Sequence, residues 1–270
     1  MGRGRGPGRF VARAVVTAYL FLLVAWPLWL VAQNTFDGGL ENLRGIVEDP
    51  DVVHALQLTV VVAVVAVVIN TVFGVGISIL IVRYEFPGRR LLNALLDVPL
   101  SVSPIVVGLA LVLVYGGRSG WFGPGLESAG LQVIFATPGI VLATTFVALP
   151  LVIREVVPVL EEIGTEQEQA AQSLGATALQ TFRRITLPAI RWGVTYGAVL
   201  SLARSLGEFG AVKVVSGNVL GETRTATLVV EEKYLNFDQG GAYATAFLLA
   251  LVAVACIVIV SVIRPKEEPR

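Results

Sequence analysis

Two ionisable residues, Arg204 and Glu208, stand four positions apart in an otherwise apolar stretch. On a helix this spacing places both side chains on one face, where they can form an ion pair. A charge within a membrane costs about 2.5–3.5 kcal/mol on the insertion scale, so such residues usually face a protein interior or a polar cavity. The pair therefore indicates either a polar element beside a path for a charged solute, or a static salt bridge or surface pair. The sequence leaves these interpretations open.

Two hydroxyl groups, those of Ser101 and Ser103, lie in the segment "DVPLSVSPIVVG". Pro99 and Pro104 in the same segment predict a kinked helix, because proline removes backbone hydrogen bonds that must be replaced inside the protein. Hydroxyl groups could replace water around an anion, so both serines are candidates for a translocation path. The alternative is a packing helix whose serines bond to their own backbone.

Catalytic chemistry is not indicated anywhere in the chain. The single histidine, His54, and the single cysteine, Cys256, are far apart and cannot make a usual transition-metal site. We find neither a nucleophile-base triad nor a G-x-x-x-x-G-K-[ST] loop for nucleotide phosphates. The sequence therefore predicts no enzyme, no metal and no cofactor in this chain. Any nucleotide that drives the protein must bind to another chain.

The composition places the chain in a membrane. It has 270 residues, of which 55% are hydrophobic and only 15% are charged, and its mean hydropathy is +0.76. A span needs about 20 apolar residues to cross a hydrocarbon core of about 30 Å. Five windows of sufficient length carry no charge: 14–36, 55–82, 98–117, 128–153 and 240–263. A sixth span, from Trp192 to about Leu206, is interrupted by Arg204.

The positions of the basic residues predict the orientation. Fourteen of the twenty lysines and arginines fall in alternate connections: Arg3, Arg5, Arg9, Arg13, Arg83, Arg89, Arg90, Arg154, Arg183, Arg184, Arg191, Arg264, Lys266 and Arg270. The positive-inside rule places these connections in the cytosol, which requires an even number of spans and two cytosolic termini. We therefore expect an all-α, six-span protein of the cytoplasmic (inner) membrane. It has a basic tail over 1–13, one transmembrane domain over 14–263 and a tail over 264–270. Residues 207–239 could be wholly external or could return to the bilayer.

The connection over 154–191 contains the segment "EQEQAAQSLGATALQTFRRITLP", residues 166–188, which predicts two short helices. Thr165 with Glu168, and Thr177 with Gln180, have the spacing of capping boxes that begin helices. Gly175 lies between them, where a left-handed residue can end the first helix, and Pro188 is expected to stop or bend the second. Two apolar faces follow from helical spacing: Ala170, Ala171 and Leu174 on the first helix, and Leu179, Phe182 and Ile185 on the second.

A helix-turn-helix of this kind could suggest DNA binding. However, a DNA reader needs a free recognition helix that reaches a major groove, and this segment is fixed between two membrane spans. The sequence therefore favours a compact cytosolic element that docks into a soluble partner and transmits movement to the spans. No nucleic-acid partner is expected.

The spacing of this loop resembles the coupling (EAA) loop of ABC importer permeases. That family has Glu-Ala-Ala, three residues, a glycine, nine residues and Ile-x-Leu-Pro. The matching residues here are Ala170, Ala171, Gly175, Ile185, Leu187 and Pro188. The first position departs from the pattern, because Gln169 replaces the glutamate and Glu168 is its neighbour. The resemblance implies that Glu168, Gln169 and these six residues seat the loop on an ATPase subunit, with shape and small alanines rather than the missing charge as the basis of docking.

A narrower resemblance covers nearly the whole chain from Ala55 onward. The segments "REVVPVLEEIG", "FRRITLPAIRWG", "ARSLGEFGAVKVVSGN" and "GETRTATL" resemble the CysW family of sulfate/thiosulfate importer permeases. This resemblance implies a MetI-like transmembrane fold with cytosolic coupling helices. It also implies four kinds of partner: a second permease of CysT type, a dimer of ATPase subunits that binds ATP and Mg²⁺, an extracytoplasmic sulfate-binding protein and membrane lipid.

The function expected from these features is the ATP-driven import of sulfate or thiosulfate, with Ser101, Ser103, Arg204 and Glu208 as candidates for the path. Molybdate permeases share a related "LGEFG" element, so a homodimeric molybdate or tungstate importer is the first alternative. An ion-coupled secondary anion transporter is the second. A membrane-embedded enzyme would need clustered His, Asp or Glu at the ends of several spans, which the sequence does not contain.

Overall fold

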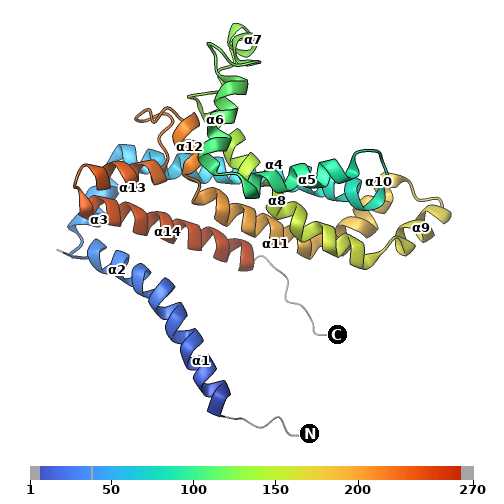
Figure 1. Ribbon diagram of the computed structural model, residues 1–270, viewed down its shortest axis with the longest axis horizontal. Helices are drawn as coiled ribbons and strands as arrows, with labels where there is room; N and C mark the ends of the chain where they lie inside the picture. The colour runs from blue at the N-terminus through green and yellow to red at the C-terminus, as the bar shows by residue number, and fades with distance from the viewer. Residues whose placement is uncertain (1–6, 38, 263–270) are drawn as a thin grey trace.

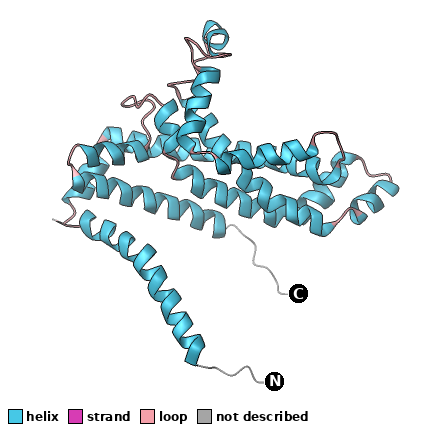
Figure 2. Ribbon diagram, viewed as in Figure 1, coloured by secondary structure: helices cyan, strands magenta, loops and turns pink. Residues whose placement is uncertain are grey.

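The computed structural model describes residues 7–37 and 39–262, and every regular element in these ranges is a helix (Figure 2). The all-α prediction is therefore confirmed. Five of the basic residues used to predict orientation lie outside the described residues: Arg3, Arg5, Arg264, Lys266 and Arg270.

Four long helices run along the length of the molecule (Figure 1): α4 (Pro50–Arg83), α8 (Thr137–Ile163), α11 (Leu187–Leu206) and α14 (Gln239–Val262). Helices α4, α8 and α11 pack against one another as the centre of the bundle. Their contact buries Val75, Val152, Val156, Leu160 and Ile190 in one cluster. This core extends to the end of the bundle where α9 and α10 lie.

Glycines bring these three helices together. A Cβ atom at Gly197 would lie 2.7 Å from the Cα atom of Val152, and one at Gly193 would lie 2.8 Å from the carbonyl oxygen of Glu155. Gly193 and Gly197 are four residues apart on α11 and form the small-xxx-small pattern that allows close packing of membrane helices. On the other side, a Cβ atom at Gly74 of α4 would lie 2.8 Å from Cγ1 of Val152. Val152 is thus enclosed by two glycine-bearing helices.

We predict that Gly74→Leu lowers the free energy of unfolding by about 1–3 kcal/mol, the usual cost of overpacking a core. Gly76→Leu, two residues along the same helix, is the matched control, because a Cβ atom at Gly76 has no neighbour within 4 Å. Thermal denaturation of both variants in detergent, followed by size-exclusion chromatography, measures the difference. Equal melting temperatures would show that the α4–α8 contact is not close-packed.

The predicted spans correspond only in part to single helices. Within the described residues, four helices are long and apolar enough to cross a membrane: Ala12–Thr35, Pro50–Arg83, Thr137–Ile163 and Gln239–Ile259. The first of these runs from within α1 (Pro7–Leu20) through the π turn η1 (Phe21–Ala25) and α2 (Trp26–Thr35), and it diverges from the bundle (Figure 1). Helix α11 has 20 residues but is not among the four. The count of six spans stays a prediction.

The expected third span, 98–117, is not one continuous helix. Helix α5 (Arg89–Ser101) and helix α6 (Pro104–Tyr115) meet at an angle of 115°. The kink is at the predicted place, since Val102 and Ser103 before Pro104 are extended and proline disfavours a helical conformation in the preceding residue. As a result, α6 and α7 (Gly123–Ser128) project away from the bundle (Figure 1).

The expected fourth span, 128–153, is displaced along the chain. Residues 129–136 form a connection, and α8 begins at Thr137, with a proline in its first turn, and continues to Ile163. Proline is well placed there, because the first amides of a helix need no partner within it. The predicted cytosolic loop, 154–191, therefore begins with the last part of α8, from Arg154 to Ile163.

Residues 207–239, left open by the sequence, fold back into the protein. Helix α12 (Gly210–Val215) packs against α6 and α8 and buries Ala211, Val212 and Val215. Helix α13 (Ala226–Leu235) lies against α14 and α4, and the short α3 (Glu41–Glu48) lies beside α14. This segment is part of the core and not a free external loop.

Candidate functional site

The loop between α8 and α11 contains α9 (Glu166–Ser173), α10 (Ala178–Thr181) and the π turn η2 (Phe182–Thr186). The second capping box is confirmed: the Gln180 amide donates to Thr177 Oγ1 at 3.3 Å, and the Thr177 amide donates to Gln180 Oε1 at 2.8 Å. Gly175 has a φ of +88°, as expected for the left-handed residue that ends α9. The predicted turn between two short helices is therefore present.

The prediction of the first capping box, by contrast, is wrong. The Thr165 side chain accepts no backbone hydrogen bond from α9; its Oγ1 atom instead accepts a bond from Gln169 Nε2 at 3.1 Å. The carboxylate of Glu168 instead binds a cationic partner in another helix. A charge-assisted bond of that kind is about twice as strong as a neutral one.

That partner is Arg83, the last residue of α4. Arg83 Nε lies 2.9 Å from Glu168 Oε2, and the two side chains are only 10% and 16% exposed. Thr186 of η2 donates its hydroxyl to Glu168 Oε1 at 2.7 Å. Glu168, which the resemblance assigned to docking on an ATPase, therefore has its carboxylate bound within this chain itself.

Arg83 also holds the end of α8. Its Nη1 atom donates to the carbonyl oxygen of Leu160 at 3.0 Å, and its Nη2 atom donates to that of Gly164 at 2.7 Å. The planar guanidinium offers five donors in a fixed geometry, so it can bind a carboxylate and two carbonyls at once. We call Arg83, Glu168 and Thr186 the loop clamp. It connects α4, α8, α9 and η2 at a single point.

Sequence reasoning missed the role of Arg83 and used it only to predict orientation. Its partners lie 77 to 85 residues away in the chain, so no local spacing pattern reveals them. The one available signal was its position at the end of a long apolar helix.

Pro188 does not stop the second helix, contrary to one of the two expectations. Helices α10, η2 and α11 follow one another without a break, and the Leu187 amide donates to Phe182 O, five residues earlier. The wider π turn precedes Pro188, which then occupies the first turn of α11. Because a π turn already lacks the regular i→i−4 bonds, the proline ring is accommodated there.

The remaining loop residues divide between an outer and an inner surface. Ala170, Leu174, Gly175 and Leu179 are exposed, with Leu174 89% exposed, and we call these four residues the loop tip. Ala171 and Ile185 are half-buried, while Gln169, Leu187 and Pro188 are exposed. Phe182 packs against the α8–α11 core and does not share an outer face with Leu179 as predicted. The loop thus presents a small apolar tip held by a buried clamp.

The second candidate region is the junction of α11 and α12, where the predicted ion pair forms. Arg204 Nη1 lies 2.6 Å from Glu208 Oε2, with side-chain exposures of 37% and 2%. The carboxylate also accepts the Ala211 amide at 2.9 Å, and the Glu208 carbonyl accepts the Thr227 hydroxyl at 3.0 Å. Glu208 therefore holds α12 and α13 in place, while Arg204 remains partly accessible.

The two candidate serines differ in their hydrogen bonds. Ser101 Oγ donates to the Asp97 carbonyl at 3.1 Å, which is the backbone-bonded alternative. Ser103 precedes α6 and makes no capping bond. The starts of α6 and α12 are in contact, since a Cβ atom at Gly210 would lie 3.0 Å from Cβ of Pro104. The structure thus brings the start of α6, which Ser103 precedes, against the segment that follows Glu208, whereas the hydroxyl of Ser101 is bonded within α5.

Comparison with known proteins identifies the family to which this chain belongs. The family model "Binding-protein-dependent transport system inner membrane component" matches residues 70–268, a range that includes the loop clamp and the α11–α12 junction. The chain belongs to this family. It is therefore a multi-pass permease component of the inner membrane, and the resemblance found in the coupling loop is confirmed.

Two relatives of the permease are named sulfate transport system permease proteins. The chain is 45% identical over 258 residues to CysW of Synechocystis sp., covering 96% of this chain and 93% of that protein. It is 36% identical to CysT of Salmonella typhimurium, covering 90% and 87% of the two chains. The match to the CysW sequence is the stronger of the two, in agreement with the resemblance to the CysW family.

A solved structure supports the fold of the permease. A bacterial ABC transporter involved in the import of alginate superposes with a TM-score of 0.77 over 93% of each chain, at 16% identity. This likeness confirms the ABC-importer transmembrane fold.

Proposed function

We propose that the permease is the CysW-type subunit of an ABC importer that moves sulfate or thiosulfate inward. The observation that carries this proposal is the 45% identity to a sulfate permease over 96% of the chain. Its partners are a second permease of CysT type, a dimer of ATPase subunits with ATP and Mg²⁺, and an extracytoplasmic sulfate-binding protein. No chemical step takes place in this chain.

The cytosolic side of the permease is the end of the bundle that carries α9 and α10. Arg83 ends α4, Arg89 begins α5, and Arg183, Arg184 and Arg191 lie in η2 and the first turns of α11, all at this end. Segments rich in basic residues remain in the cytosol. Both termini are cytosolic in this topology. The loop tip then faces the ATPase subunits.

Coupling proceeds through the loop clamp. ATP closes the ATPase dimer, which moves the loop tip, and the bonds of Arg83 transfer that movement to the ends of α4 and α8. Both helices pack on α11, whose far end carries Arg204 and is followed by Glu208. A doubly charged anion that leaves water there needs hydroxyl groups and a cation, which Ser103 and Arg204 supply.

Reconstitution in proteoliposomes with the proposed partners tests this function. We expect uptake of radiolabelled sulfate that requires ATP and is inhibited by thiosulfate but not by molybdate. Molybdate or tungstate uptake by the chain with an ATPase but no second permease would establish the homodimeric alternative. Uptake that follows an ion gradient without ATP would establish a secondary transporter.

The docking of the loop gives a separate prediction. Ala171→Trp should weaken binding of the ATPase subunit at least about tenfold, which corresponds to about 1.4 kcal/mol, because a large ring beside the loop tip prevents close approach. Gln169→Ala removes only an exposed bond to Thr165 and should change the affinity less than about twofold, too small an effect for an interface anchor. Pull-down titration with the purified ATPase measures both. Equal effects would contradict docking by shape.

A further inference from the structure

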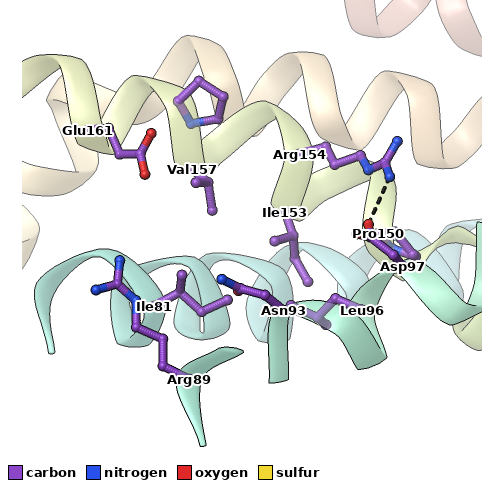
Figure 3. Close-up of a pocket in the computed structure, with 11 residues that line it drawn as sticks. Ile81, Arg89, Asn93, Leu96, Asp97, Pro150, Ile153, Arg154, Val157 and Glu161 are labelled. Atoms are coloured by element: carbon purple, nitrogen blue, oxygen red, sulfur yellow. Dashed lines mark hydrogen bonds and ion pairs between the residues drawn. The ribbon is translucent and has the colours of Figure 1, made fainter. Parts of the chain in front are cut away.

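A cleft with a volume of about 360 Å³ lies between α5 and α8 and reaches α4 (Figure 3). It is separate from the loop clamp and from the α11–α12 junction. Its walls are apolar over most of their length: Ile81, Leu96, Pro150, Ile153, Val157 and Pro158. Four charged residues and one amide complete the lining: Arg89, Asn93, Asp97, Arg154 and Glu161.

The charges at the two ends of the cleft differ in their pairing. At one end Arg154 Nη2 lies 2.8 Å from Asp97 Oδ1, so these charges compensate each other. At the other end Arg89 extends from α5 and Glu161 extends from α8 (Figure 3). Neither side chain has an ion pair or hydrogen bond with any described residue, and the same holds for Asn93 between them. The cleft therefore has one cationic and one anionic group available across the same opening.

The end of the cleft with Arg89 and Glu161 is the end that the proposed topology places beside the lipid headgroups. Arg89 is the first residue of α5, and Glu161 is two residues before the end of α8, at the end of the bundle that the proposed topology places in the cytosol. Basic residues between membrane helices on this side bind lipid headgroups; here Arg89 is the basic residue left unpaired among the described residues, in a cleft whose two arginines are balanced by Asp97 and Glu161. The apolar side chains lie between this end and the Arg154–Asp97 pair at the other end, where they can cover the glycerol and the first acyl carbons.

We propose that this cleft binds a phospholipid whose headgroup carries a primary ammonium group. Arg89 and the Asn93 amide bind the phosphate, the Glu161 carboxylate accepts hydrogen bonds from the ammonium, and the apolar walls cover the glycerol and the first acyl carbons. The lipid then connects α5 to α8 at the point where α5 would otherwise have no polar contact with it. The placement of this lipid at the cytosolic leaflet rests on the proposed function.

Other ligands fit the cleft less well. Free sulfate would lie close to the Glu161 carboxylate and would leave the apolar walls uncovered. An anionic lipid such as a phosphatidylglycerol has the same repulsion from Glu161. A choline headgroup carries a positive charge but cannot donate a hydrogen bond to the carboxylate. Of these ligands, only phosphatidylethanolamine combines an anionic phosphate for Arg89 with a cationic N–H donor for Glu161.

Native mass spectrometry of the assembled, delipidated transporter tests the proposal, with added dioleoyl-phosphatidylethanolamine, -glycerol or -choline as the probe. We expect phosphatidylethanolamine to bind at least about tenfold more tightly than the other two. Arg89→Gln and Glu161→Gln should each abolish this preference. Arg90→Gln and Glu162→Gln, neighbouring exposed residues that do not line the cleft, should retain it within about twofold.

Several outcomes would overturn the proposal. Equal binding of the three lipids, or a preference that survives both cleft variants, would show that the cleft selects no headgroup. Displacement of the lipid by sulfate would show that the cleft is an oxyanion site. If a partner chain covered the cleft in the assembled transporter, so that none of the three lipids bound there, the cleft would be a contact between proteins instead. Sulfate uptake by the unmodified protein is measured separately, so failure of the lipid site and failure of the proposed function are distinguishable.

Discussion

Arg83→Gln is expected to uncouple ATP hydrolysis from transport and to loosen the coupling loop. The change leaves the Glu168 carboxylate, 16% exposed, without its cationic partner and also removes donors to the carbonyls of Leu160 and Gly164. Removal of one partner from a buried pair costs about 3–5 kcal/mol, and we expect a value near the lower end because some solvent reaches the pair. Uptake should fall below a tenth of its normal rate while ATP hydrolysis continues.

Limited proteolysis of residues 165–186, together with parallel assays of ATP hydrolysis and uptake, measures the two effects. Arg44→Gln is the control, because the Arg44–Glu48 pair is 79% and 62% exposed and such pairs contribute about 0–1 kcal/mol. Arg83→Lys keeps the charge but cannot reach all three partners and should be intermediate. If Arg83→Gln were as resistant to protease as Arg44→Gln, the clamp would not hold the loop.

The double variant Arg83→Gln, Glu168→Gln separates stability from coupling. It removes both buried charges, so much of the lost stability should return. The mechanical connection between α9 and α4 stays broken, so transport should not return. Recovery of both together would mean that Arg83 acts only by neutralising Glu168.

The sequence predicted best those features that depend on neighbouring residues. Proline at 104 restricts the residue before it, so the kink between α5 and α6 was predictable from a few letters. Gly175 and the Thr177–Gln180 box were predictable for the same reason. Residues 129–136 were misassigned because an uncharged apolar segment has the same hydropathy in a connection as in a helix, and hydropathy alone does not show that α8 begins at Thr137.

Features that depend on distant residues were not predictable. The first capping box failed because Glu168 binds Arg83, 85 residues away, more strongly than it would bind a backbone amide of its own helix. The fold-back of α12 depends on Gly108 and Gly210, which let α6 and α12 approach. No periodicity in either segment reveals that contact. The cleft between α5 and α8 likewise exists only because the break at Val102–Ser103 leaves α5 alongside α8.

The second large effect concerns the α11–α12 junction. Arg204→Ala is expected to abolish sulfate uptake, or to raise the apparent KM at least about tenfold, equivalent to about 1.4 kcal/mol. It leaves Glu208, with a side chain only 2% exposed, as an uncompensated buried charge, and it removes the cation we assign to the path. Lys213→Gln is the control, since Lys213 forms its ion pair with Glu231 at a more exposed position of α12. If uptake and its saturation were unchanged in Arg204→Ala, Arg204 would not be part of the path.

A static salt bridge and a path residue predict different results in the double variant Arg204→Met, Glu208→Gln. Glutamine keeps an oxygen for the Ala211 amide, which now bonds Glu208 Oε1 at 2.9 Å, and methionine fills a volume similar to that of the arginine stem. If the pair only stabilises the junction, both thermal stability and uptake should recover, because replacing a buried pair by uncharged groups is often neutral. If Arg204 contacts the anion, stability should recover and uptake should not. We expect the second result, because the guanidinium remains 37% exposed while its carboxylate partner is fully enclosed, an asymmetry that a purely structural pair does not need.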